Sequence, residues 1–180
     1  ALLERTGVPT ALLITRGFGD ALRIGYQQRP ALFDRHIRLP EPIYRTVLEL
    51  DERVDADGEI ITALDEKKLR ADLTALRADG IRAVAIVLMH GYRHHRHELI
   101  AETLAHEAGF EQVSVSHKVG ALARLVPRGD TTVVDAYLSP VLRHYVDRLT
   151  DRLGDISNRL VQIALRLVSN APAPKGHCKV

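Results

Sequence analysis

Several histidines in this sequence could bind a metal ion or transfer a proton. Four of them fall within the stretch LMHGYRHHRHEL (88–99), namely His90, His94, His95 and His97. Imidazole changes its charge near neutral pH and is also a common metal ligand. The stretch is therefore a metal site, a catalytic loop, or a turn between a strand and a helix that happens to be rich in imidazole.

The spacing of the last three histidines favours a structural role. His94 and His97 are three residues apart with Glu98 beside them, but the HExxH order of helical zinc sites is missing. We interpret His94 and His95 as a solvated turn, and His97 with Glu98 as the start of a helix, where a carboxylate is electrostatically favoured. We assign no metal ligands, although adventitious metal binding by His94, His95 and His97 stays open.

His90 and His117 are the predicted catalytic residues. Each follows a predicted strand, at 81–89 and at 112–116. If these strands are parallel neighbours, both imidazoles stand at the same edge of the sheet, where they could polarise a carbonyl or carry a proton. A contact with substrate or metal and a hydrogen bond from the ring to the backbone remain equal alternatives for both.

The predicted substrate-binding residues are Arg16, Gly17 and Arg29. The stretch TRGFGD (15–20) follows a strand, and its glycines let backbone N–H groups approach a ligand. It matches neither GxGxxG nor GxxxxGK[ST], which favours a tight turn over a phosphate site. The two arginines could hold a carboxylate with paired hydrogen bonds, or they could form surface ion pairs.

The composition excludes several classes of function. The 180 residues carry 25 basic and 23 acidic side chains without a basic stripe, so we expect no nucleic acid partner. A single cysteine excludes an intrachain disulfide and favours the cytoplasm. No apolar run approaches the roughly 20 residues of a membrane span, so we expect no membrane association.

The order of the predicted elements indicates an α/β fold with a mostly parallel sheet and flanking helices. We expect strands at 10–15, 44–55, 59–64, 81–89 and 112–116, and helices at 1–7, 65–79, 98–109 and 130–153, with a short helix after residue 16. Strands that alternate with helices favour parallel packing, and ligands gather at the carboxyl ends of such strands. The pair 44–55 and 59–64 is predicted to form a hairpin across the turn ADG.

Several details of these elements are specific enough to check. Asp65 is the expected N-cap of the second long helix, and Asp130 that of the last one. Leu99, Ile100 and Leu104 are expected to face inward, and Pro140 to kink its helix or mark a join. We expect the segment 26–42 to be irregular and the tail 171–180 to be disordered.

Six stretches, in this order, resemble the N-terminal region of the ATP-dependent hydantoinase and 5-oxoprolinase family, of the hydantoinase A type. They are ALLERTGVPTALLITRGFGDALRIGYQQRPALFDRHI (1–37), ELDERVDADGEI (49–60), AVAIVLMHGY (83–92), HELIAETL (97–104), VSVSHKVG (113–120) and RGDTTVVDAYLSPVLRHYV (128–146). Members resemble actin-type ATPases built on ribonuclease-H-like folds. The resemblance therefore implies that the sheet is part of such a fold.

The resemblance also implies a reaction. ATP, with Mg²⁺, phosphorylates the oxygen of a cyclic amide or imide such as 5-oxoproline or a hydantoin, and water then opens the ring. Related subunits serve ketone carboxylases. The implied partners are the small cyclic substrate and either a second subunit of the hydantoinase B type or further copies of the chain.

The chain also departs from the family. The phosphate-binding loop is expected upstream of residue 1, His94 and His95 replace an Asn-Pro-like turn, and 157–180 does not resemble the family's continuation. We expect a family-type α/β domain at 1–128, a long helix at 129–156 and an atypical, partly disordered tail at 157–180. The chain is then a fragment of a cyclic amidohydrolase that is inactive and binds no nucleotide tightly by itself. The alternatives are a non-catalytic interaction module and a ketone-carboxylase-type subunit.

Overall fold

The structure is a computed structural model, and it describes residues 2, 4–26 and 41–169. The chain divides into two compact units, Ala1–Val141 and Leu142–Val180. The first unit contains the sheet and the described site residues Arg16, Gly17, His90 and His117. Arg29, most of the segment 26–42 and the tail 171–180 with Cys178 lie outside the described residues, so the predictions made for them stay predictions.

The first unit is built on a parallel sheet of four strands. In spatial order these are β2 (Thr46–Leu50), β1 (Thr10–Thr15), β5 (Ala83–Val87) and β6 (Gln112–Val115), and every neighbouring pair is parallel. The two central strands are buried at every position. Strands covered on both faces need apolar side chains on both sides, which explains their continuous apolar sequence. The predicted fold class is confirmed.

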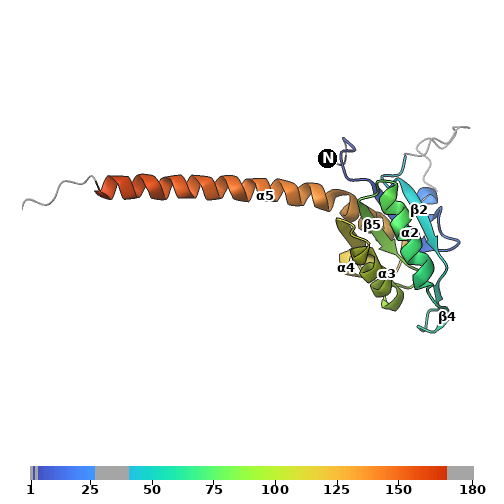
Figure 1. Cartoon of the computed structure of the whole chain (residues 1–180). Helices are drawn as coiled ribbons and strands as arrows, with labels where there is room; N and C mark the ends of the chain where they lie inside the picture. The colour runs from blue at the N-terminus through green and yellow to red at the C-terminus, as the bar shows by residue number, and fades with distance from the viewer. Residues whose placement is uncertain (1, 3, 27–40, 170–180) are drawn as a thin grey trace, which may run out of the picture. The chain divides into compact units, whose positions relative to one another are not determined.

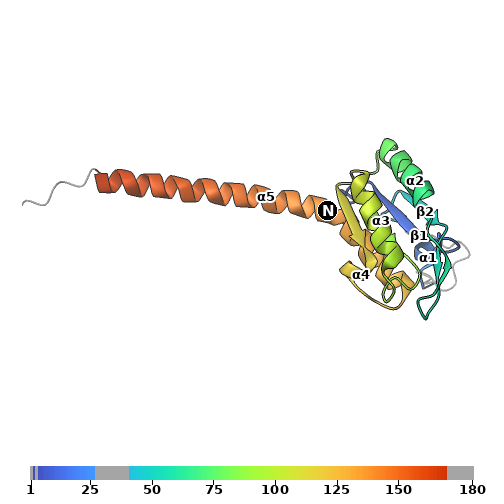
Figure 2. The same ribbon diagram turned by 60° about the horizontal axis from the view of Figure 1, so that its bottom comes forward.

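Helices cover both faces of this sheet. The helices α2 (Glu66–Ala78) and α3 (Arg96–Glu107) lie side by side on one face, where Leu69, Leu73 and Leu104 join the core (Figure 2). The opposite face packs against Leu22 of α1 (Ala21–Ile24) and Val133 near the start of α5 (Leu125–Ser169). Figure 1 shows β2 and β5 behind α2. The short helix α4 (Ser116–Val119) follows β6 directly.

The predicted hairpin is shorter than expected, because the segment 44–55 is not one strand. Its first part is β2, which pairs with β1 in the parallel sheet. The chain then turns at the buried Glu52, and only β3 (Arg53–Val54) pairs with β4 (Ile60–Thr62) in an antiparallel manner. Sequence periodicity could not detect this division, since both parts are extended.

The helix predictions hold in part. The Asp65 carboxylate accepts a hydrogen bond from Lys68 N (3.0 Å) and caps α2, as predicted. Asp130, by contrast, lies inside α5, which already begins at Leu125 with Pro127 in its first turn, where proline removes no helical hydrogen bond. The predicted helix at 1–7 is also wrong, since the described residues of that range form a turn.

Leu99 is the residue whose orientation the sequence predicted wrongly. It is 45% exposed, whereas Leu104 on the same helix is 3% exposed. The inward face of α3 is set by the polar pair His97 and Glu98 together with Ala101, because both polar side chains are buried. Leu99 follows that pair and therefore points away from the sheet.

Pro140 lies inside α5, and the division between the two units falls just after it, at Val141. The predicted domain boundaries at 128 and 156 stay predictions.

The two leucines of α3 offer a matched test of this arrangement. Leu104→Ala should lower the free energy of unfolding by about 2 to 5 kcal/mol, because it empties a buried site. Leu99→Ala should change it by less than about 1 kcal/mol, since that side chain is largely in water. Urea unfolding of the chain followed by circular dichroism measures both. A greater loss for Leu99→Ala would show that α3 faces the sheet with a different side.

Candidate functional site

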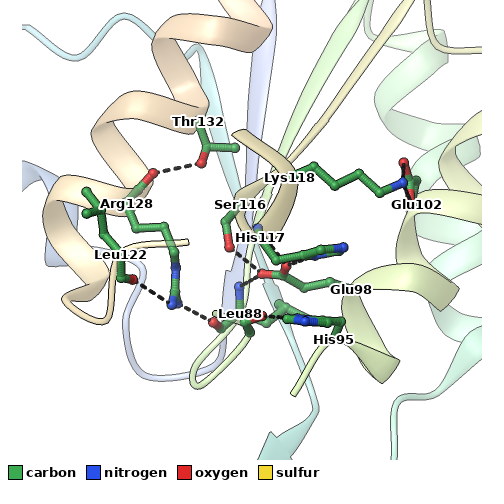
Figure 3. A network of polar contacts seen from close by, with 11 residues as sticks. Leu88, His95, Glu98, Glu102, Ser116, His117, Lys118, Leu122, Arg128 and Thr132 are labelled. Carbon is green, nitrogen blue, oxygen red and sulfur yellow. Dashed lines mark hydrogen bonds and ion pairs between the residues drawn. The ribbon is translucent and has the colours of Figure 1, made fainter. Parts of the chain in front are cut away.

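A buried carboxylate, Glu98, lies at the carboxyl ends of β5 and β6. Its side chain is fully buried and accepts hydrogen bonds from Leu88 N (2.9 Å) and Ser116 Oγ (2.6 Å). The Nδ1 atom of His117 lies 2.7 Å from its second oxygen, and His117 N donates to the same oxygen at 3.3 Å. Figure 3 shows these groups gathered around the carboxylate. Glu98 of α3 thus connects the ends of β5 and β6.

A buried guanidinium contacts the carbonyl oxygen of Leu88, the residue whose N–H donates to Glu98. Arg128 of α5 is 1% exposed, and its Nη2 donates to the carbonyl oxygen of Leu88 at 2.6 Å, while Nη1 donates to Leu122 O at 3.2 Å (Figure 3). Burial lowers the pKa of Arg128, and the charge of Glu98 partly offsets that shift. The backbone of Leu88 therefore contacts a carboxylate through its N–H and a guanidinium through its carbonyl oxygen.

The local sequence explains why the carboxylate can come so close to the strand end. Gly91 lies in the turn after β5, and a Cβ atom added there would be 2.3 Å from Glu98 Oε1. A larger residue at 91 would therefore displace the carboxylate. Glu98 is also in the first turn of α3, where the helix dipole favours a negative charge.

A second buried carboxylate–histidine pair lies beside the first. Glu52 follows β2, and its Oε2 lies 2.7 Å from Nδ1 of His97, both side chains being almost fully buried. Thr15 at the end of β1 donates to the other oxygen of Glu52 and accepts from Met89 N at 2.8 Å. The consecutive residues His97 and Glu98 thus anchor α3 to the ends of all four parallel strands.

The structure gives His117 a defined orientation. Its Nδ1 is engaged by Glu98, and its ring stacks on that of His95 with centroids 4.4 Å apart and planes 18° apart. In the described part of the chain, Nε2 of His117 makes no hydrogen bond, and 10% of the side chain is exposed. A histidine held through Nδ1 can accept or deliver a proton at Nε2.

His90 follows β5, and His117 follows β6. These two strands are parallel neighbours, as the prediction for the two histidines required. The backbone of His90 has φ +58°, a left-handed conformation that is unusual for a residue other than glycine. Its carbonyl accepts bonds from Arg93 N and His94 N, and its ring centroid lies 6.4 Å from that of Tyr92. Among the described residues, the aromatic partner of His117 is therefore His95, and that of His90 is Tyr92.

Arg16 takes part in a surface ion-pair network. It pairs with Asp51, which also receives Lys68 Nζ at 2.6 Å, and the Arg16 side chain is 61% exposed. The hydrogen bond from Lys68, followed by the charge of Arg16, lowers the pKa of the Asp51 carboxyl below its ordinary value of 3.8. Arg16 is thus occupied in the way that the ion-pair alternative describes.

The glycine turn after β1 already holds a carboxylate of the chain itself. Gly17 has φ +89°, and the N–H groups of Gly17 and Gly19 both donate to Glu49 Oε1, at 3.0 and 2.8 Å. The turn does not fit the phosphates of ATP, because both of its N–H donors are already occupied by a carboxylate.

The remaining histidines of the stretch 88–99 have structural partners. His94 Nε2 lies 3.1 Å from Ala56 O in the hairpin turn, and His95 Nδ1 lies 2.7 Å from Gly91 O. Over the described ranges, no group of three or more His, Cys, Asp or Glu side chains is placed to hold a metal ion.

Sequence reasoning missed Glu98, Arg128 and Glu52 as central residues of this site. Glu98 was interpreted only as a favourable charge at a helix start, while Arg128 and Glu52 entered only as members of stretches that resemble the family. The available signal was their position just after, or facing, the ends of predicted strands. A charged residue in such a position is buried only when it has partners, which a single sequence does not reveal.

Taken together, these features define an α/β domain with a parallel sheet and a polar network of buried acids and histidines at the carboxyl ends of its strands. The profile of the hydantoinase/oxoprolinase N-terminal region matches residues 1–109. The chain belongs to this family, as its resemblance implied.

Known relatives agree with this assignment. The 5-oxoprolinase 1 of Arabidopsis thaliana is 39% identical over 90% of this chain and 15% of its own length. The crystal structure of the ATP-dependent caprolactamase from Pseudomonas jessenii matches 83% of this chain and 22% of its own, with 31% identity and a TM-score of 0.74. An acetone carboxylase structure, at 21% identity and a TM-score of 0.72 over 86% of this chain and 24% of its own, shows the same fold.

This chain spans about 15% of the length of its curated relatives. Within the described residues, no helix combines the length and the apolar character needed to cross a lipid bilayer.

The buried carboxylate can be tested by neutralising it. Glu98→Gln should lower the free energy of unfolding by about 2 to 4 kcal/mol, because Arg128 loses its compensating charge and an amide NH₂ group would face donors. Glu107→Gln on the same helix, which affects an exposed pair with Arg70, should cost less than about 1 kcal/mol. Denaturant unfolding of both variants decides, and equal stabilities would contradict the proposed network.

The Asp51 network should make stability depend on pH. Because the pKa of Asp51 is lowered on folding, its contribution is present above the unfolded pKa near 3.8 and is lost as the pH falls through the lower folded pKa. Asp51→Asn should therefore make the chain less stable near neutral pH and less sensitive to acid below about pH 4. Urea midpoints at several pH values measure this, with Asp57→Asn in the hairpin turn as the control. A variant as acid-sensitive as the unaltered chain would refute the role of Asp51.

Proposed function

We propose that this chain is part of an ATP-dependent cyclic amidohydrolase of the hydantoinase/5-oxoprolinase type, which opens a lactam or imide ring. The observation that supports it best is the His117–Glu98 pair at the strand ends of a domain that belongs to this family. The activity would require the whole protein, since the chain spans only a small part of its relatives.

In this proposal His117 handles a proton during ring opening. Glu98 accepts from Nδ1–H, which fixes the ring and leaves Nε2 to take a proton from the attacking water or to give one to the departing amine. His95 holds the ring by stacking on it. His90, which follows the neighbouring strand, is the second candidate for contact with the reacting amide.

The proposed substrate-binding residues are Arg16, Gly17 and Arg29. Arg16 would have to leave Asp51 in order to bind a substrate carboxylate, and the turn at Gly17 would have to release Glu49. Both exchanges replace one carboxylate by another, so the chemistry of the contact stays the same. ATP and Mg²⁺ would be held by other parts of the protein, since the glycine turn does not fit phosphate.

The proposed partners are a small cyclic amide and either a subunit of the hydantoinase B type or further copies of the chain, in the cytoplasm. A caprolactamase relative is named as an alpha subunit, which supports assembly with a second kind of subunit.

A non-catalytic interaction module is the second candidate. The observation that favours it is a set of large apolar side chains that α5 exposes beyond Val141, each at least 41% exposed: Leu142, Tyr145, Val146, Leu149, Leu153, Ile156 and Leu160. In that case the hydantoinase B type of partner would occupy this helix face. The ketone-carboxylase alternative has no support beyond the shared fold.

The test uses a full-length protein that carries this chain. His117→Asn keeps an N–H donor near the position of Nδ1 but removes Nε2, so kcat for ring opening should fall about 100-fold while the folded state persists. ADP and ring-opened product are measured with 5-oxoproline, hydantoin and caprolactam. His106→Gln, an exposed histidine of α3, is the matched control.

Two outcomes would overturn parts of this proposal. Full activity of His117→Asn would remove His117 from the reaction. The absence of ADP above background from the unaltered full-length protein with all three substrates would remove the enzyme proposal and leave the interaction module.

A further inference from the structure

The second unit, Leu142–Val180, exposes a regular row of apolar side chains on α5. In the first unit the same helix buries Val133, Ala136 and Tyr137, whereas beyond Val141 its large apolar side chains are in water. Six of these form the row, and each is between 41% and 65% exposed: Leu142, Val146, Leu149, Leu153, Ile156 and Leu160. Such a row is unfavourable in water and marks an interaction surface.

The spacing of this row is that of a coiled coil. Successive members follow one another after four, three, four, three and four residues, which is the pattern of heptad positions d and a. In the sequence the pattern continues with Ile163 and Leu167, so eight apolar positions extend over about four heptads. A repeat of this length indicates a coiled coil, because a helix that packs on a globular core follows a period of 3.6 residues and not 3.5.

The side of the helix away from the row is polar in the heptad 146–152. Asp147, Arg148 and Asp151 occupy its positions b, c and f, and all three are exposed. The apolar row is therefore a narrow seam with a charged back, which is the form of a helix that pairs with another helix along one side.

The residues beside the seam favour a second copy of the chain in parallel orientation. Position g carries the exposed Arg152 and Arg159, while position e carries Thr at 150 and Ser at 157. In an antiparallel pair of copies the g positions face each other, which brings arginines together. In a parallel pair each g position faces a neutral e position of the partner, so these arginines are kept apart.

The seam itself also favours two copies. Val146 at position a lies between Leu142 and Leu149 at position d, and a β-branched residue at a with leucine at d favours two strands. Identical seams in parallel register place each apolar residue opposite its own equivalent, which is the symmetry of most homodimers.

We propose that two copies of the chain associate in parallel and in register through α5 from Leu142 onward, as a two-stranded coiled coil. The inference deepens the interaction-module candidate and rests on it, and it names a second copy as the occupant of this helix face in place of a subunit of the hydantoinase B type. It does not depend on ring opening, because the seam contains none of the proposed catalytic or substrate-binding residues.

The first test measures the association of the 180-residue chain. Sedimentation equilibrium between about 1 and 100 μM should show a monomer–dimer equilibrium. Leu149→Glu, at position d, should raise the dissociation constant about 100-fold or more, because the seam would then bury a charge. Arg148→Glu introduces the same side chain on the charged back and should change the constant less than about threefold. Far-ultraviolet circular dichroism of both variants verifies that the helix is retained.

Disulfide cross-linking tests the orientation. Cys178→Ser removes the native thiol, and Leu142→Cys, Leu149→Cys and Ile156→Cys are then introduced and oxidised one at a time. A parallel pair in register brings each of the three positions within disulfide distance of its equivalent, so all three variants should cross-link. An antiparallel pair can bring together at most one of them.

Three results would overturn the proposal: a chain that stays monomeric at the highest concentration, a trimer or larger assembly, or cross-linking at no more than one position. Equal association of the two glutamate variants would also do so. The face would then be left to a subunit of the hydantoinase B type or to another segment of a full-length protein. A confirmed dimer without ADP release by the full-length protein would retain this inference and remove only the enzyme proposal.

Discussion

The backbone of Leu88 is the point on which this end of the fold depends. Its N–H donates to Glu98 and its carbonyl accepts from Arg128, so two successive peptide groups connect a buried anion to a buried cation. Isolated buried charges are costly, and each of these two is tolerated because a polar backbone group and the opposite charge lie within reach. The interaction fixes where β5 ends, and it thereby fixes the start of the turn that contains His90.

The same constraint determines how α3 packs. Its first turn places His97 and Glu98 next to each other, and the two side chains engage carboxylate or histidine partners that follow β2 and β6. Because both must remain buried, the rotation of the helix about its axis is set at its polar end. The apolar Leu99 is consequently placed in solvent, although a purely hydrophobic pattern would bury it. Keeping the buried polar groups hydrogen-bonded outweighs the burial of one leucine here. A buried carboxylate without partners costs more free energy than the burial of one leucine side chain would gain.

The local elements of the fold could be predicted from the sequence, and the contacts between distant residues could not. The strands β1 and β5 are continuous apolar runs, and Asp65 is an N-cap whose mechanism is local, so both were predictable from a few neighbouring residues. The division of the segment 44–55 into β2 and β3 was not, because it depends on which distant strand each half pairs with. Glu98 and Arg128 were missed for the same reason. Their partners Leu88 and His117 are separated from them by 10 or more residues in the chain, and only the assembled sheet brings those partners close.

The distribution of charge indicates which part of the proposed reaction the described residues could serve. At the glycine turn, two N–H groups that could face a phosphate are held by Glu49, and Asp20 lies next to this turn. The exposed Arg16 is held by Asp51, so an incoming anion would have to displace that carboxylate. The polyanionic part of a nucleotide would gain little from such a surface, whereas a neutral cyclic amide would not be repelled by it. The described residues are thus better suited to the amide side of the proposed reaction than to its phosphate side, which agrees with a region that forms only a small part of its relatives.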